Sequence, residues 1–110
     1  MLAYKILRPD EYQALRQDGR SAGAPVDIAD GFIHLSTAEQ VSGTLAKHFA
    51  GEPGLVLLAI QTDGLDPLRW EPSRGDALFP HLYRELRLTD ILWSREIALN
   101  DQGHDPGELT

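Results

Sequence analysis

Apolar residues occur in short runs along the chain, and these runs predict a fold that mixes strands and helices. The first run, 2–7, predicts a strand that ends at Arg8-Pro9, because proline has no amide hydrogen for a sheet. The run over 55–60 is apolar throughout, which is typical of a central strand buried on both faces. Further short strands are predicted over 68–71, 79–83 and 90–99.

Two helices are predicted between these strands. Pro9 suits the first turn of a helix, and the acidic residues after it favour the positive end of the helix dipole. This helix runs to about residue 17. Ser36 followed by Glu39 fits a capping box, so a second helix is expected to start near Thr37. Its buried stripe is spaced every four residues: Val41, Leu45 and Phe49.

Between and after these elements lie two segments without a periodic pattern. Residues 19–30 are rich in small and turn-forming residues and predict a loop, and long loops are often functional. Residues 101–110 form a polar tail that we expect to be frayed. Residues 1–100 are then one α+β domain: a strongly bent, mostly antiparallel or mixed sheet with two main helices.

Composition narrows the classes of function. The net charge is −7, which argues against DNA binding, because a nucleic-acid binder needs a basic face. The chain has no cysteine, so disulfides and thiol chemistry are excluded, and its four histidines show no metal-ligand spacing. No apolar run approaches the ~18 residues of a membrane-spanning helix, and no signal peptide is apparent. We therefore expect a cytoplasmic protein without a membrane or metal partner.

The charge is unevenly distributed. Five of the eight arginines lie between residues 69 and 95: Arg69, Arg74, Arg84, Arg87 and Arg95. This segment could recognise a small anionic or phosphorylated ligand, since arginine binds phosphate through a planar fork of donors. Alternatively, the arginines pair with nearby carboxylates on a solvated surface.

One candidate site follows from strand alternation around His34. Phe32, His34 and Ser36 share one face of the predicted strand, whereas Ile33 and Leu35 share the other. Phe32 should therefore lie beside His34. His34 and Ser36 would point toward a helix N-terminus, which favours anionic groups. In the alternative interpretation, Ser36 only caps the helix and His34 only bonds a neighbouring loop.

Two further clusters lie later in the chain. Arg69 and Glu71 alternate onto one face of a strand, with Trp70 on the other face as an expected core anchor. They could form an internal ion pair, or a ligand clamp with a general base. His81 and Tyr83 also share a face and are capable of stacking and proton transfer.

These clusters resemble motifs of the domain-of-unknown-function 952 family, a group of small bacterial proteins. Residues 30–37 with Gln40-Val41, residues 68–71 and residues 79–83 match in order and spacing, and the resemblance extends from about residue 4 to 100. One position departs from the family pattern: Arg84 stands where glycine is common.

The resemblance implies a fold similar to the ADP-ribosyltransferases and RNA 2′-phosphotransferases, with NAD as a possible cofactor. By that similarity His34 would hold a ribose, Tyr83 would stack on nicotinamide, and Glu71 and Glu85 are rival acids. The expected catalytic residues are His34, Glu71 and His81. The expected ligand-binding residues are Ser36, Thr37, Arg69, Arg74 and Tyr83.

Three functions remain open at this point. The chain could be an ADP-ribosyl- or phosphotransferase-like enzyme that binds NAD, ADP-ribose or a phosphorylated nucleotide. It could instead be a non-catalytic domain that senses a metabolite or nucleotide. In the third possibility the same polar residues form only an internal hydrogen-bond network. An open cleft lined by these residues would weaken the third possibility.

Overall fold

The computed structural model describes residues 1–73 and 75–109, and these residues form an α+β fold, as predicted. The α-helices are α1 (Pro9–Asp18), α2 (Pro25–Asp30) and α3 (Val41–His48), and a 3-10 helix covers Leu88–Asp90. The strands are β1 (Leu2–Leu7), β2 (Arg20–Ser21), β3 (Ile33–His34), β4 (Val56–Gln61), β5 (Leu68–Pro72), β6 (Leu78–Leu82), β7 (Leu86–Arg87), β8 (Ile91–Glu96), β9 (Ala98–Asn100) and β10 (Gly103–Asp105).

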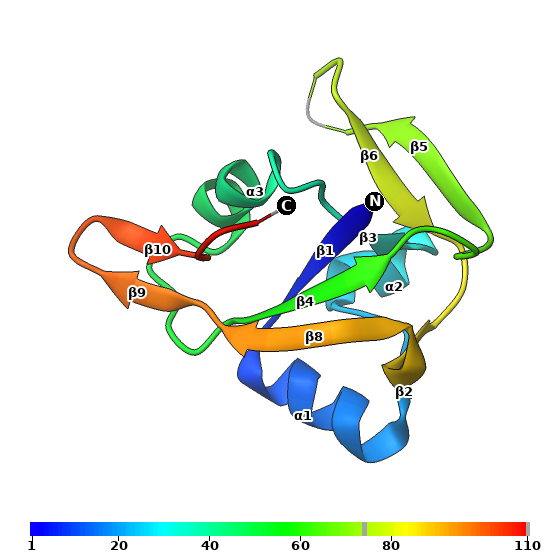
Figure 1. The fold of residues 1–110 in the computed structure, drawn as a ribbon, viewed down its shortest axis with the longest axis horizontal. Coiled ribbons are helices and arrows are strands. Elements are labelled where there is room, and N and C mark those ends of the chain that lie inside the picture. The colour runs from blue at the N-terminus through cyan, green and yellow to red at the C-terminus, as the bar shows by residue number, and fades with distance from the viewer. Residues whose placement is uncertain (74, 110) are drawn as a thin grey trace.

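The strands form several antiparallel sheets instead of the single bent sheet that was predicted. Two sheets have three strands, in the orders β1-β4-β8 and β3-β6-β5 (Figure 1). Two further sheets have two strands each: β2 pairs with β7, which is distant in the sequence, and β9 pairs with β10 in a hairpin. An isolated bridge between Tyr4 and Ser36 connects the edge of β1 to the chain just after β3. This bridge brings the two larger sheets together, and the site lies beside it.

The prediction for residues 55–60 is confirmed, because β4 is the central strand of its sheet and is buried on both faces. Leu57 and Ala59 belong to one core cluster, with Val41 and Leu45 of α3. Leu58 and Ile60 belong to the other cluster, with Leu15 of α1 and residues of β3 and β6. Burying a side chain such as Leu58 contributes about 1.5–3 kcal/mol.

The segment predicted as a loop, 19–30, contains helix α2, so the structure has three α-helices where two were expected. Pro25 occupies the first turn of α2, and the Asp27 carboxylate accepts a hydrogen bond from the backbone amide of Ala24. Gly31 ends the helix in the left-handed conformation, with φ 85°. None of the helices in the described part of the chain is long and apolar enough to cross a membrane.

The start of α1 at Pro9 is confirmed, whereas α3 begins at Val41, four residues after the predicted start. The capping box between Ser36 and Glu39 does not form. The backbone N–H and C=O of Ser36 pair instead with Tyr4, at 2.8 and 2.7 Å. The side chain of Gln40 accepts a hydrogen bond from the amide of Thr37 at 3.0 Å. Ser36 is therefore part of a sheet edge, not of a helix N-terminus.

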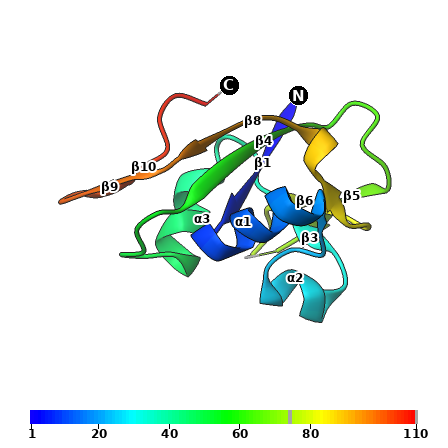
Figure 2. The same ribbon diagram turned by 90° about the horizontal axis from the view of Figure 1, so that it is seen from below.

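The C-terminal region also differs from the prediction. The strand expected over 90–99 is divided by buried Ile97 into β8 and β9. The tail is not frayed over residues 103–105, because β10 pairs with β9 in a hairpin that extends from the body of the molecule (Figure 2). His104 bonds the Glu52 carbonyl at 2.7 Å, and Arg95 donates to the carbonyls of Pro106 and Glu108.

Trp70 was predicted to anchor the core, and this prediction is wrong. Its side chain projects from the β5–β6 hairpin opposite Pro80, and the residue is 41% exposed. β5 is an edge strand, and only its first residue, Leu68, reaches the apolar cluster.

Candidate functional site

Three neighbouring strands place polar side chains in one row. His34 of β3 lies opposite His81 of β6, and His81 lies opposite Arg69 of β5. Directly opposed residues project from the same face of a sheet. The Phe32 ring packs at the same place, with centroid distances of 4.5 Å to His34 and 4.2 Å to His81.

The alternation predicted for this segment is confirmed. Phe32 lies on the polar face, where its ring centroid is also 5.0 Å from that of Tyr83. Ile33 and Leu35 are both 1% exposed and belong to the apolar core on the other side. The two histidines face each other edge-on across the strand pair, with ring centroids 5.2 Å apart.

The first half of the site, which we call the inner cluster, consists of Lys5, Asp27, Asp30 and His34. The side chain of Asp27 is 0% exposed. Its Oδ2 atom accepts hydrogen bonds from Lys5 Nζ and from the Ala24 amide, both at 2.7 Å. Its Oδ1 atom accepts from the His34 amide at 2.9 Å and contacts His34 Nδ1 at 2.6 Å. Every lone pair of this carboxylate is thereby engaged within the fold.

Charge and hydrogen bonding keep Asp27 ionised. Burial alone would raise the pKa of its carboxyl group, but the hydrogen bond from His34 and the charge of Lys5 together lower that pKa below its ordinary value. His34 Nε2 lies 3.0 Å from a carboxylate oxygen of Asp30, whose side chain is 47% exposed. His34 therefore lies between two carboxylates, and an imidazole donates to both only when both ring nitrogens carry hydrogen.

The second half, which we call the outer cluster, consists of Arg69, Glu71, His81 and Tyr83. Glu71 Oε1 contacts His81 Nδ1 at 2.9 Å and accepts a hydrogen bond from the Tyr83 hydroxyl at 2.6 Å. The hydrogen bond from Tyr83, and then that from His81, lowers the pKa of Glu71, and the same bond to Glu71 raises the pKa of Tyr83. The Arg69 guanidinium lies 5.4 Å from the centroid of the Tyr83 ring.

His81 links the outer cluster to the interior. Its side chain is 4% exposed. In the neutral form of the ring, Nδ1 carries the hydrogen that bonds the carboxylate of Glu71, and Nε2 is left as an acceptor. This Nε2 atom is buried and has no hydrogen-bond partner among the described residues. A carboxylate-oriented histidine with a free nitrogen has the form of a general base.

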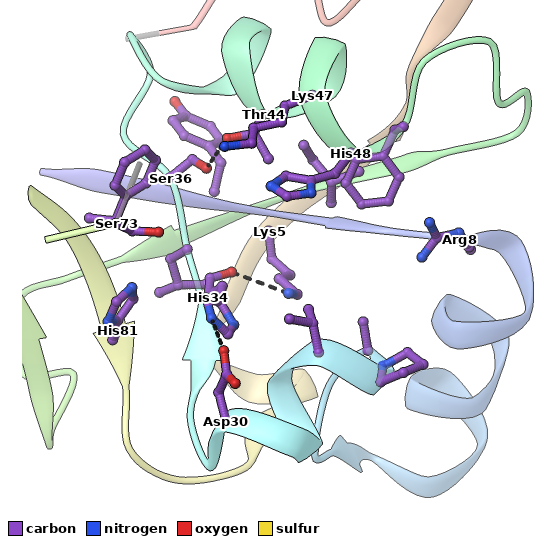
Figure 3. Close-up of a pocket in the computed structure, with 18 residues that line it drawn as sticks. Lys5, Arg8, Asp30, His34, Ser36, Thr44, Lys47, His48, Ser73 and His81 are labelled. Carbon is purple, nitrogen blue, oxygen red and sulfur yellow. Dashed lines mark hydrogen bonds and ion pairs between the residues drawn. The ribbon is translucent and has the colours of Figure 1, made fainter. Parts of the chain in front are cut away.

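A pocket of about 680 Å³ opens beside the inner cluster, between β1, β3, α2 and α3 (Figure 3). Its polar and charged lining residues are Lys5, Arg8, Asp30, His34, Ser36, Thr44, Lys47, His48, Ser73 and His81. Its walls include the apolar or aromatic side chains of Tyr4, Ile6, Val26, Phe49 and Phe79. The hydroxyls of Ser36 and Thr44 bond each other at 3.1 Å on one wall.

The lining of this pocket is strongly biased toward basic side chains. Six basic or titratable nitrogen side chains face it, against the single carboxylate of Asp30: Lys5, Arg8, His34, Lys47, His48 and His81. The protein as a whole carries a net charge of −7. Arg8 is bound by Glu52 at 2.8 and 3.1 Å, whereas exposed Lys47 has no ion-pair partner among the described residues. Among the described residues of the lining, Lys47 is therefore the cation that is available to a ligand, whereas Lys5 and Arg8 are paired with Asp27 and Glu52.

The structure divides the residues predicted for the site into two groups. His34, Ser36 and His81 line the pocket. Arg69, Glu71 and Tyr83 lie outside its lining, in the outer cluster, and Glu71 contacts the lining residue His81.

The remaining predicted residues lie elsewhere. Thr37 uses its amide to bond Gln40, and its side chain is not in the lining. Arg74 lies outside the described residues. Glu85 is exposed, 3.9 Å from Arg20, so it is not near the histidines. Arg84, which stands at the family's common glycine position, pairs with Asp90 at 2.9 and 3.0 Å.

Two residues of the inner cluster were missed from the sequence, as were the pocket-lining residues Arg8, Asp30, Thr44, Lys47 and His48. Lys5 lies within the apolar run of β1 and was counted only as part of a strand. Asp27 lay in the presumed loop, although its position two residues after Pro25 is a helix-start pattern. A lone lysine inside a buried strand was the available signal, because buried lysine requires a partner. Its partner, 22 residues away, is not indicated by any local pattern.

Histidine and carboxylates come together here, but in the described part of the chain no group of three such side chains has the arrangement of a metal site. The carboxylates serve instead as hydrogen-bond acceptors for the two histidines.

Comparison with known proteins identifies the family to which this chain belongs. A model of the DUF952 family, described as a protein of unknown function, matches residues 6–94. The crystal structure of protein CC0527 from Caulobacter crescentus is 47% identical, with a TM-score of 0.89, and the match covers 94% of this chain and 92% of that one. Its solution NMR structure gives 48% identity and a TM-score of 0.81, covering 94% and 90%. No curated protein matches. The chain belongs to the DUF952 family.

Proposed function

We propose that the pocket binds a small anionic, nucleotide-like ligand such as NAD, ADP-ribose or a phosphorylated nucleotide. The observation that carries this proposal is the lining of the pocket, where three cationic side chains (Lys5, Arg8 and Lys47) and three histidines face the single carboxylate of Asp30, in a protein of net charge −7. Charge of one sign in a cleft attracts ligands of the opposite sign.

The size and the walls of the pocket support the same ligand class. Ligand pockets are typically about 300–1,000 Å³, and this one is about 680 Å³. Tyr4, Val26, Phe49 and Phe79 supply apolar and aromatic surface for a base or ring, and the hydroxyls of Ser36 and Thr44 are placed to bond sugar or phosphate oxygens. Lys47 at the rim, without a partner among the described residues, is suited to a phosphate.

The proposal extends to the ADP-ribosyltransferase-like fold. Two three-stranded antiparallel sheets that meet at the Tyr4–Ser36 bridge, with the pocket beside that junction, are compatible with a bent or split sheet. Fold similarity alone is a weak argument for activity, so the ligand class rests on the lining of the pocket.

A second candidate function, group transfer, is favoured by one observation: Glu71 orients His81, and His81 Nε2 is buried without a partner in the described structure. In this proposal His34 orients NAD, and a hydroxyl of the acceptor attacks the ribose carbon as the bond from that carbon to nicotinamide breaks. Nicotinamide leaves, and His81 accepts the hydroxyl proton. General-base catalysis of this kind contributes about 10²–10⁴-fold in rate. The alternative is a sensor domain that binds the same ligand without turnover.

Thermal unfolding with NAD, ADP-ribose and phosphorylated nucleosides tests binding. A ligand at 100 times its dissociation constant should stabilise the protein by about 2.7 kcal/mol. Lys47→Glu should reduce this stabilisation. Arg20→Glu changes the net charge equally at an exposed site outside the pocket, so it should leave the stabilisation unchanged. Absence of stabilisation by every one of these compounds would contradict the proposed ligand class.

The His81→Asn variant separates enzyme from sensor. If the protein is a transferase, incubation with NAD and chromatography of the products should show turnover by the wild type, and the variant should lose turnover while it retains binding. A wild type that binds these ligands and leaves them intact would favour the sensor.

A further inference from the structure

A charged pair is buried beside the pocket. The side chain of Lys5 is 7% exposed and that of Asp27 is 0% exposed, and Lys5 Nζ lies 2.7 Å from Asp27 Oδ2. On β1, Lys5 occupies a position between Ala3 and Leu7, which both belong to the apolar core. Strand alternation therefore places a lysine where this sheet face otherwise carries apolar side chains.

A gain in folding stability does not account for the presence of a buried ion pair. Removing two charges from water costs free energy that their attraction only partly repays, and apolar side chains of similar volume are often equally stable in such positions. The Lys5–Asp27 pair is therefore better explained by the neighbouring groups that it holds in place.

Three contacts of the pair converge on a single residue, His34. Asp27 Oδ1 accepts from the His34 amide at 2.9 Å and contacts its ring Nδ1 at 2.6 Å. Lys5 Nζ donates to the His34 carbonyl at 3.2 Å (Figure 3). The backbone N–H, the backbone C=O and the ring of one histidine are thus all held by the same pair.

The packing around Asp27 fixes its carboxylate in this position. Gly23 has φ +98°, and a Cβ atom at this residue would lie within 2.2 Å of Asp27 Oδ2. The Ala24 amide bonds the same oxygen at 2.7 Å. The turn before α2 is therefore shaped around this carboxylate.

We infer that Lys5 and Asp27 are positioning residues that hold the His34 ring with Nδ1–H inward and Nε2 toward Asp30 and the pocket, and that the pair serves the site more than the fold. The inference deepens the proposed function, on which it rests for the role of His34 in ligand binding. The contact with Asp27 Oδ1 requires a hydrogen on Nδ1 and thereby fixes which edge of the ring faces Asp30.

The double variant Lys5→Met/Asp27→Asn tests the inference. It removes both charges at nearly constant volume. The single carbonyl oxygen of asparagine can replace only one of the two Asp27 oxygens, so it can accept either from the Ala24 amide or from the His34 amide and ring. The asparagine side chain therefore no longer fixes which group, carbonyl or NH₂, faces His34 Nδ1. We expect the melting temperature to stay within about 5 °C of wild type. Long-range ¹H–¹⁵N NMR correlations should show that the His34 ring nitrogen signals change, and ADP-ribose affinity should fall by about tenfold or more.

Control variants separate this result from a general effect of lost charge. Arg84→Met/Asp90→Asn removes another hydrogen-bonded ion pair, which lies outside the pocket lining, and should leave the His34 signals and the affinity unchanged. Lys5→Met and Asp27→Asn alone should each melt lower than the double variant, because each leaves one charge buried without its partner.

Each outcome decides the question. Unchanged His34 ring signals in the double variant would overturn the inference, and so would a failure to fold or a melting temperature as low as in the single variants. Unchanged ADP-ribose affinity would also overturn it. If the wild type does not bind ADP-ribose, the proposed ligand fails, while the NMR and melting data on the unliganded protein still support or overturn the positioning role.

Discussion

The two carboxylate–histidine pairs of the site are arranged in opposite ways. In the inner cluster the acid, Asp27, is 0% exposed and the histidine, His34, is 26% exposed. In the outer cluster the acid, Glu71, is 35% exposed and the histidine, His81, is 4% exposed. The inner pair therefore exposes its histidine to the pocket, whereas the outer pair exposes its carboxylate to solvent.

This difference indicates different roles for the two pairs. A buried carboxylate with four hydrogen bonds fixes its histidine rigidly, because no water competes for those bonds. The exposed carboxylate of Glu71 also contacts solvent, so its histidine is held by packing against the Phe32 ring as well as by the bond to Glu71. The inner pair is thus suited to present a fixed donor to a ligand, and the outer pair is suited to keep one nitrogen free.

The largest effect is expected from Asp27→Ala. The change leaves the Lys5 ammonium buried without a counter-ion and removes the acceptor for two backbone amides, so urea unfolding should show a loss of about 3–5 kcal/mol. Asp30 lies on the same helix and contacts the same histidine, but its side chain is 47% exposed. Asp30→Ala should therefore lower the free energy of unfolding by less than about 1 kcal/mol. Equal losses in the two variants would contradict the contrast between buried and exposed acid.

Gly23→Ala should have the next largest effect. The added Cβ would meet Asp27 Oδ2 and would also require φ +98°, so we expect a loss of about 2 kcal/mol or more in urea unfolding. Gly64→Ala provides the matched control, because Gly64 has φ +76° and no atom within 4 Å of the added Cβ. It should lose only about 1 kcal/mol through backbone strain. A Gly23 variant no less stable than the Gly64 variant would show that the turn tolerates a displaced Asp27.

Acid unfolding tests how much the ionised carboxylate of Asp27 contributes to stability. The pKa of Asp27 is lower in the folded protein than in the unfolded chain, so the stability it contributes is present above about pH 4 and is lost as the pH falls through the folded pKa. Wild type should therefore lose stability faster below about pH 4 than the Lys5→Met/Asp27→Asn variant. Denaturant titrations at several pH values measure this slope, and identical slopes would mean that Asp27 does not contribute to it.

Glu71→Gln should have the smallest effect on stability, because the carboxylate is partly exposed. Its expected signature is spectroscopic: without the carboxylate, the pKa of Tyr83 should fall toward the ordinary value for tyrosine. The absorbance of tyrosinate during alkaline titration measures this shift, and Tyr83→Phe identifies the signal. If the Tyr83 titration is the same in Glu71→Gln and wild type, the hydrogen bond between these side chains is not formed in solution.

The sequence predicts the parts of this site that follow from strand periodicity. Alternation around residue 33 correctly separates Phe32 and His34 from Ile33 and Leu35, and the continuous apolar run correctly marks β4 as central. These predictions succeed because each needs only the side-chain period of a strand and the burial of one face.

Other features depend on contacts that are distant in the sequence. The Ser36–Glu39 pattern fails as a capping box because the backbone of Ser36 pairs with Tyr4, which no local pattern indicates. The Lys5–Asp27 pair likewise joins a strand to a helix 22 residues later. Trp70 is exposed because its hairpin extends past the core, so its apolar character does not predict its burial.

The central claim is that the basic pocket beside His34 binds an anionic, nucleotide-like ligand. Titration of the ¹⁵N-labelled protein with ADP-ribose, followed by backbone amide chemical shifts, tests it most directly. The account predicts saturable shifts at Lys5, Ser36, Lys47 and His48, with Arg20 and the β9–β10 hairpin unchanged. An absence of shifts, or shifts confined to residues outside the pocket lining, would contradict it.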